Sequence, residues 1–158
     1  MSDQSVQALD HALRLLGPRP RSERELGDRL RAAGHPDEAV EAALTRAKQL
    51  DLVDDAAFAR QWVEERSSRK GFGIHKLRAE LRAKGVASDV IDDALGSLDE
   101  DEQRASAEAF ATKQAARLVD LPLPVQAARI RAALLRRGYE GDIANDAVRA
   151  ALPPEGWD

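Results

Sequence analysis

The chain has 158 residues, long enough for one domain or for several small units that share a core. Leu, Ala and Arg dominate the composition, aromatic residues make up only 4% and β-branched residues are scarce, which favours helices over sheets. The absence of cysteine excludes a disulfide framework and a thiolate metal site. A net charge of −4 argues against coating DNA by bulk charge, although a local basic face could still bind it.

The first third of the chain predicts three helices. Residues 5–16 carry apolar side chains at helical spacing and are followed by a Gly-Pro pair that ends the helix. Ser22 and Glu25 have the spacing of a capping box for a second helix, which ends at Gly34. A third helix follows a His-Pro pair. The expected buried residues of the first and third helices are Val6, Leu9, Leu13, Leu16, Val40, Ala43, Leu44 and Ala47.

The middle third predicts three more helices. Asp54 is the expected N-cap of the first, and Val53 can pack on Phe58 as a hydrophobic staple. The segment "RKGFG" at 69–73 separates this helix from the next, which Gly85 ends with a positive φ. The expected core residues are Phe58, Ala59, Trp62, Val63, Ile74, Leu77, Leu81, Val90, Ile91, Ala94, Leu95 and Leu98.

The last third predicts helices near 100–118, 124–137 and 142–151, the first two separated by the breaker "DLPLP". Three segments of the chain share one pattern: an apolar residue, another four positions later, and a glycine four positions after that. They are Leu26/Leu30/Gly34, Leu77/Leu81/Gly85 and Ile130/Leu134/Gly138. The glycines are 51 and 53 residues apart, a period that is typical of repeated helical units.

These patterns predict an all-α fold. We expect a tandem repeat of three three-helix units that form an elongated, curved helical stack. The expected units span residues 1–53, 54–99 and 100–158, the last with a C-terminal tail. Each unit needs its neighbours to complete its core.

Patterns that would indicate catalysis or metal binding are missing. His11, His35 and His75 lie in separate segments, and none has a partner at metal-ligand spacing. "GFG" lacks the second half of a nucleotide-binding fingerprint, and no serine lies in a nucleophile elbow. In the pairs Asp54-Asp55 and Asp92-Asp93, adjacent helical residues point about 100° apart, so their carboxylates do not converge on one substrate. We expect no enzyme, cofactor or metal.

Aromatic residues are few, and most fit a core position. Phe58 and Trp62, four residues apart, could stack on bases, but their helical spacing favours the core. Phe72, between two glycines, is either a loop anchor or a partner contact. Trp157 lies beyond the last helix and has no assigned role.

The start of the chain, "MSDQSVQ", has no apolar signal core. No stretch approaches the roughly 20 apolar residues that a membrane-spanning helix needs. A cytoplasmic protein is therefore expected.

Charge divides sharply in the middle of the chain. Residues 60–84 contain eight Arg or Lys and three Glu, whereas residues 85–102 contain seven Asp or Glu and no Arg or Lys. A turn of about 100° per residue places His75, Arg78 and Arg82 on one flank of a helix. Arg-rich helices that only expose charge to solvent would give the same pattern. The candidate partner-binding residues, on this flank, its repeat equivalents and the adjacent basic segment, are Arg24, Arg31, Arg66, Arg69, Lys70, His75, Arg78, Arg82 and Arg131.

Three stretches match the pattern of a known family. They are "ALRLLGPRPRSERELGDRLRAAG" in the first unit, "LDLVDDAAFARQWVEERSSRKGFGIHKLRAELRAKGV" in the second and "LLRRGYEGDIANDAV" in the third. With these residues the chain resembles the bacterial RecX proteins, modulators of the RecA recombinase; "LPLP" at 121–124 departs from the pattern. The resemblance implies tandem three-helix units that bind the RecA filament and restrain its ATPase, strand-exchange and coprotease activities.

The preferred interpretation is therefore a non-enzymatic regulator that binds RecA filaments, and that could also touch the DNA backbone within them. One alternative is a DNA-binding module of helix-turn-helix-like units, which predicts tight, steeply salt-dependent DNA binding without RecA. Another is a helical scaffold that binds neither. The expected assembly is a monomer or a dimer that exchanges one unit between chains.

Overall fold

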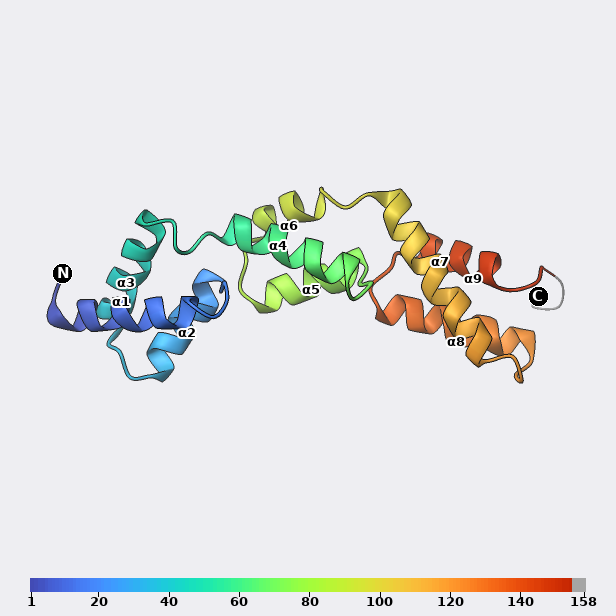
Figure 1. Ribbon diagram of the computed structural model, residues 1–158, viewed down its shortest axis with the longest axis horizontal. Helices are drawn as coiled ribbons and strands as arrows, with labels where there is room; N and C mark the ends of the chain where they lie inside the picture. The colour runs from blue at the N-terminus through green and yellow to red at the C-terminus, as the bar shows by residue number, and fades with distance from the viewer. Residues whose placement is uncertain (155–158) are drawn as a thin grey trace. The chain divides into compact units, whose positions relative to one another are not determined.

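The computed structural model describes residues 1–154, and the regular structure in this part of the chain is entirely helical (Figure 1). The all-α prediction is therefore confirmed. Within these residues, no helix combines the length and apolar character that crossing a bilayer requires. Trp157 lies outside the described residues. The helices are α1 (Asp3–Leu16), α2 (Glu23–Ala32), α3 (Asp37–Gln49), α4 (Asp55–Ser68), α5 (Ile74–Ala83), α6 (Ser88–Leu95), α7 (Glu100–Arg117), α8 (Leu123–Arg136) and α9 (Gly141–Ala151).

The chain divides into two compact bodies, which are described separately. Body 1 comprises residues 1–61 and 81–94, and body 2 comprises residues 62–80 together with the described residues from 95 onward. Helices α4 and α5 each pass from one body into the other. The expected boundaries of three sequence units stay a prediction.

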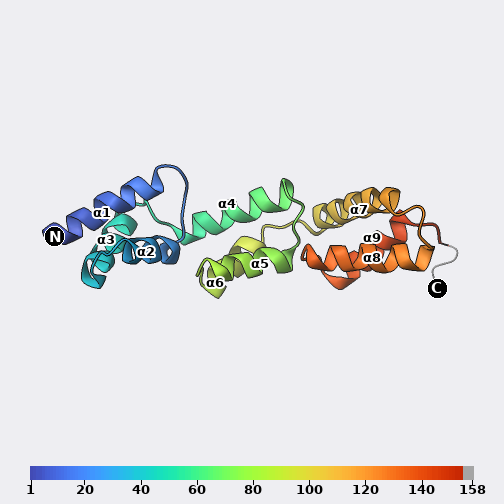
Figure 2. The same cartoon turned by 90° about the horizontal axis from the view of Figure 1, so that it is seen from below.

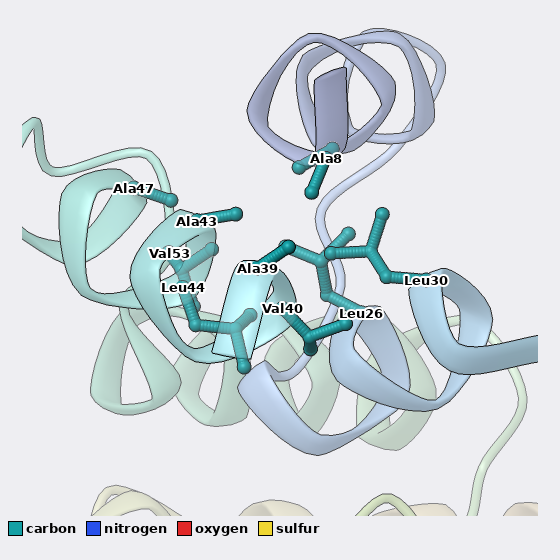
Figure 3. Close-up of a cluster of buried hydrophobic side chains, with 10 residues drawn as sticks. Ala8, Leu26, Leu30, Ala39, Val40, Ala43, Leu44, Ala47 and Val53 are labelled. Atoms are coloured by element: carbon teal, nitrogen blue, oxygen red, sulfur yellow. The ribbon is translucent and has the colours of Figure 1, made fainter. Parts of the chain in front are cut away.

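In body 1, α1 packs along α3, and α2 packs against both (Figure 1). The side chains between these helices are mostly alanine, valine and leucine, and Figure 3 shows them converging from the three helices. The buried stripe predicted for α3 is confirmed. The core residues are Ala8, Ala12, Leu26, Leu30, Ala39, Val40, Ala43, Leu44, Ala47 and Val53.

The stripe predicted for α1 is wrong in two of its four residues. Val6 is 45% exposed and Leu13 is 40% exposed, whereas Ala8 and Ala12 are completely buried. The helix turns its small side chains toward α3, because alanines let two helix axes approach closely. The larger Leu9, Leu15 and Leu16 then pack at the edge of the core.

The start of α4 follows the prediction. The Ala57 N–H donates to the Asp54 carboxylate at 3.1 Å, and Val53 and Phe58 are both buried. Trp62, by contrast, is only half-buried. Its indole N–H donates to Glu80 at 3.3 Å, and the Arg66 guanidinium lies 4.0 Å from its ring centroid, which keeps the polar edge accessible.

Most of the other core residues predicted for α4, α5 and α6 are buried, but three are only half-buried: Ile74, Val90 and Leu98. Each lies at or near a helix terminus, where a side chain has neighbours on one side only. Leu98 lies beyond the end of α6. The prediction extended the buried stripes of these helices too far.

In body 2, α7 packs against α8 and α9, and α8 packs against α9 (Figure 2). Tyr139, 1% exposed, contributes a large buried side chain between α8 and α9. Arg104 links α7 to α9 through ion pairs with Glu100, Asp142 and Asp146 at 3.1, 3.2 and 2.7 Å. The core residues are Ala107, Ala111, Ile130, Leu134, Tyr139, Ile143, Ala144, Ala147, Val148 and Leu152.

The "LPLP" segment begins a helix. Pro122 is the N-cap of α8, and Pro124 lies in its first turn. A proline is tolerated there because the first N–H groups of a helix have no intrahelical acceptor. The Gln126 side-chain amide donates to the Leu121 carbonyl at 2.8 Å and fixes the turn that precedes α8.

Candidate functional site

The glycine that follows α5 lies against the start of α2. Gly85 has a φ of 79°, and a Cβ there would overlap the Arg24 side chain. The Ser22 hydroxyl donates to the Lys84 carbonyl at 2.6 Å and accepts from the Glu25 N–H at 3.2 Å. Ser22 therefore caps α2, as predicted, and also binds a carbonyl at the end of α5. These five residues form what we call the first junction.

Glu25 is the electrostatic centre of the first junction. Its carboxylate pairs with Arg19 at 2.7 Å, Arg21 at 3.2 Å and Lys84 at 2.5 Å, and its side chain is only 14% exposed. Burial acts to raise the pKa of Glu25, but Lys84 and Arg19 outweigh it, so the pKa is lowered. Of the predicted capping box, the structure shows the bond from the Glu25 N–H to the Ser22 hydroxyl. The Glu25 carboxylate instead pairs with cations.

A second close contact occurs at the equivalent point of the repeat, where the glycine that follows α8 lies against the start of α5. The Gly73 N–H donates to the Arg137 carbonyl at 2.8 Å, and the His75 N–H donates to the Gly138 carbonyl at 2.9 Å. A Cβ on Gly73 would overlap the backbone of Gly138, and a Cβ on Gly138 would overlap that of Lys76. These five residues form the second junction, which leaves no room for a side chain at either glycine.

The "RKGFG" loop is held in place by the third part of the chain. The Tyr139 hydroxyl donates to the Gly71 carbonyl at 2.6 Å and hydrogen-bonds the Ser106 hydroxyl at 2.9 Å. Burial raises the pKa of Tyr139, so this phenol stays protonated and keeps its donor. The Phe72 N–H donates to the Arg66 carbonyl at 3.1 Å. Phe72 is therefore part of an ordered loop.

Several candidate cations already have acidic partners. Arg31 pairs with three carboxylates, the shortest contact being 2.9 Å to Glu41. Arg66 pairs with Glu80 at 3.5 Å while it covers the Trp62 ring. Such arginines stabilise the fold locally, and their charge is largely neutralised.

Other candidates are held more loosely. Arg69 lies 3.6 Å from Glu65 with 79% of its side chain exposed, and Arg24 lies 4.0 Å from Asp28. The Arg131 Nε donates to the Asn145 side-chain oxygen at 2.7 Å, which leaves its charge without a carboxylate in that contact.

Three candidates are exposed and take part in no ion pair within residues 1–154: Lys70, His75 and Arg82. Arg78, on the same predicted flank, is half-buried and has an interaction within the protein. Lys70 and Arg82 therefore carry positive charge that no carboxylate of residues 1–154 neutralises. Arg24, Arg31 and Arg82 belong to body 1 and the remaining candidates to body 2.

The structure also shows a pair that the sequence did not predict. The Nδ1 of His11 in α1 lies 3.0 Å from the Nε2 of His35, which follows α2. Burial lowers the pKa of His11, as do the neighbouring His35 and Arg14. The two histidines are 24 residues apart, so only the packing of α1 beside the turn reveals the contact. No group of three or more potential metal ligands occurs among the described residues.

Comparison with known proteins gives two matching family models, the first three-helix domain of RecX over residues 8–46 and the second over residues 54–95. Regulatory protein RecX of Streptomyces lividans is 36% identical over 156 residues, which cover 99% of this chain and 83% of that protein. Regulatory protein RecX of Mycolicibacterium vanbaalenii is 40% identical, covering 94% of this chain and 84% of that protein. These relatives are named as regulatory proteins and not as enzymes.

Solved structures have the same fold. A crystal structure of regulatory protein RecX superposes with a TM-score of 0.87 at 26% identity, covering 92% of this chain and 73% of that one. The crystal structure of RecX from Lactobacillus salivarius also gives a TM-score of 0.87, at 22% identity, covering 96% of this chain and 98% of that one. The chain therefore belongs to the RecX family of regulatory proteins.

Proposed function

We propose that this protein binds RecA nucleoprotein filaments and lowers the ATPase, strand-exchange and coprotease activities of RecA in recombination and DNA repair. Membership of the RecX family supports the proposal. The structural observation that carries it is the exposed positive charge of Lys70 in body 2 and of Arg82 in body 1, neither of which has a carboxylate partner among the described residues. Such cations are available for acidic protein surface or for phosphate.

The mechanism would be electrostatic and steric. The backbone bonds of Gly73 and His75 hold one end of α5, and the bond from the Ser22 hydroxyl to the Lys84 carbonyl holds the other, so the backbone at both ends is ordered before a partner arrives. A protein held against neighbouring RecA subunits would disfavour ATP turnover and obstruct growth or strand pairing. Contact with the DNA backbone inside the filament is part of the proposal. Among the candidate residues, we rank the exposed Lys70, His75 and Arg82 first and the paired Arg31 and Arg66 last.

A second candidate function is a DNA-binding module. The packing of α1, α2 and α3 into a three-helix body is the observation in its favour, because helix-turn-helix readers are built from such bodies. A net charge of −4 opposes it. The two functions differ in whether tight DNA binding requires RecA.

Co-sedimentation with RecA filaments assembled on single-stranded DNA separates the candidates, with naked DNA as the control at physiological salt. We expect the protein to sediment with the filaments and to stay in solution with naked DNA. Retention on naked DNA at that salt would favour the DNA-binding module, and retention on neither would leave a scaffold.

We further propose that the protein acts in the cytoplasm, as a monomer or as a dimer that exchanges one helical unit between chains. The contacts of the junctions are made by sequence-distant segments, so a second copy can supply the same segments at little cost. Light scattering over a wide concentration range tests the dimer, and a constant monomer mass would exclude it.

A further inference from the structure

The two junctions lie at equivalent positions of the sequence repeat but carry opposite charge at one position. Lys76 precedes Gly85 by the same nine residues that separate Glu25 from Gly34. The sequence thus places a lysine at the start of α5 where α2 has its central carboxylate. In the first junction, that carboxylate neutralises three surrounding cations.

Cations also lie at the second junction and in the loop before it, but no carboxylate of residues 1–154 pairs with them. The Lys76 ammonium lies 4.0 Å from the Phe72 ring centroid, and the Lys70 ammonium lies 6.0 Å from the same centroid. Arg137 donates from Nη1 to the Lys70 carbonyl at 2.6 Å, while its guanidinium carbon lies 4.2 Å from the centroid of Phe110. We call Lys70, Lys76 and Arg137 the Lys76 cluster. None of the three takes part in an ion pair with a carboxylate of the described chain.

Three carboxylates of body 2 are paired with other arginines. Glu65 pairs with Arg69, Glu80 pairs with Arg66, and Asp142 pairs with Arg104. The cluster therefore keeps its charge in the folded protein. Cation–π contacts with the Phe72 and Phe110 rings stabilise Lys76 and Arg137. The hydrogen bond from Tyr139 to the Gly71 carbonyl fixes the loop that carries Lys70. These contacts offset the repulsion between the three cations.

We propose that the Lys76 cluster binds the phosphate backbone of a nucleic-acid strand, whose anions take the place that the Glu25 carboxylate fills in the first junction. A single carboxylate of a protein partner would gain little from these cations, because an exposed ion pair is weak. A strand brings a row of phosphates and releases the counterions condensed on them, so three adjacent cations gain more from it. The inference rests on the proposed function for its setting, and it assigns the DNA contact of that function to one cluster.

The substitution Lys76→Glu tests the cluster directly. It puts a carboxylate into a group of cations that has none, as Glu25 does in the first junction, so the variant should melt at the temperature of the parent or above it. Binding to fluorescein-labelled oligothymidylate at low salt, measured by fluorescence anisotropy without RecA, should weaken about tenfold. The slope of log K against log salt should become shallower by about 0.7 for each phosphate that the variant no longer neutralises.

Lys113→Glu is the matched control, because it makes the same change of charge at an exposed lysine of α7 outside the cluster. It should weaken binding much less. Lys76→Gln removes the charge without adding a carboxylate, so its affinity for oligothymidylate should lie between those of the parent and Lys76→Glu. It replaces Lys76→Glu in the test if the glutamate variant does not fold.

Four results would overturn the inference: no binding of oligothymidylate by the parent at low salt, parental binding by both Lys76 variants, equal losses in Lys76→Glu and Lys113→Glu, or displacement of the oligonucleotide by poly-L-glutamate as effectively as by an oligonucleotide of equal charge. The last would assign the cluster to an acidic protein surface. Because RecA is absent from this measurement, each of these results leaves the filament co-sedimentation to decide the proposed function separately.

Discussion

The Ser22 hydroxyl donates a hydrogen bond to the Lys84 carbonyl at 2.6 Å across 62 residues of sequence, and Ser22 is completely buried. The same oxygen accepts the Glu25 N–H that begins α2. Ser22→Ala removes the N-cap and also the hydroxyl that donates to the Lys84 carbonyl. We expect the free energy of unfolding to fall by about 2–4 kcal/mol, measured by urea denaturation.

Ser2→Ala is the control for this loss. Ser2 caps α1 by accepting the Ser5 N–H at 3.1 Å, and its only other side-chain contact in the structure is with Ser5, at 2.9 Å. The change should cost about 1 kcal/mol. Equal losses in the two variants would show that the bond to Lys84 adds nothing to the cap.

The three repeat glycines should differ in their tolerance of a side chain. Gly34, Gly85 and Gly138 all have positive φ, as predicted for Gly85, so alanine costs about 1 kcal/mol or more at each. A Cβ at Gly34 meets open space, at Gly85 it meets the Arg24 side chain, and at Gly138 it overlaps the Lys76 backbone. The loss of stability on substitution by alanine should therefore increase from Gly34 to Gly85 to Gly138.

Urea denaturation of the three alanine variants checks this order. A side chain such as that of Arg24 can move aside, whereas the backbone at the start of α5 cannot. A loss at Gly138 no larger than the loss at Gly34 would mean that the second junction is not closely packed in solution.

Local signals in the sequence predicted the helix ends well. Gly85 ends its helix because only a residue without Cβ enters the left-handed region easily, and Asp54 caps α4 because its short carboxylate reaches the N–H three residues on. Both features depend on neighbours within a few residues. They can therefore be read from the sequence without knowing the fold.

Features that depend on packing were missed. The hydrophobicity of Val6 and Leu13 predicted burial, but the alanine face of α1 lies against α3 because it allows closer approach. Arg31 and Lys70 looked equally available as basic residues. Only the fold shows that three carboxylates surround Arg31, while no described carboxylate pairs with Lys70.

The contact between His11 and His35 should make body 1 sensitive to mild acid. Burial, His35 and Arg14 lower the pKa of His11, so the unfolded chain binds more protons than the folded one below about pH 6.5. The contribution of His11 is therefore fully present above that pH and is lost as the pH falls toward the lowered pKa. The melting temperature should therefore decline as the pH is lowered from about 7.5 to about 5.5.

His11→Gln should show a smaller decline over the same range, because the group whose pKa is lowered has been removed. His75→Gln is the control, since His75 is exposed and its side chain makes no contact that the fold depends on. A decline in His11→Gln as large as in the parent would assign the pH dependence to other groups.

The central claim is that the protein inhibits RecA through exposed positive charge on and beside α5. Inhibition of the DNA-dependent ATPase of RecA by the variant Arg82→Glu tests this claim most directly. Arg82 is exposed and has no ion pair within residues 1–154, so its reversal should change stability by no more than about 0.5 kcal/mol. Because Arg78 has an intramolecular partner, the single variant is cleaner than the reversal of both arginines. We expect the parent and the control Lys113→Glu to inhibit alike and Arg82→Glu to need a markedly higher concentration. Inhibition by folded Arg82→Glu at the concentration of the parent would contradict the assignment of the contact to α5, and no inhibition by the parent would contradict the proposed function.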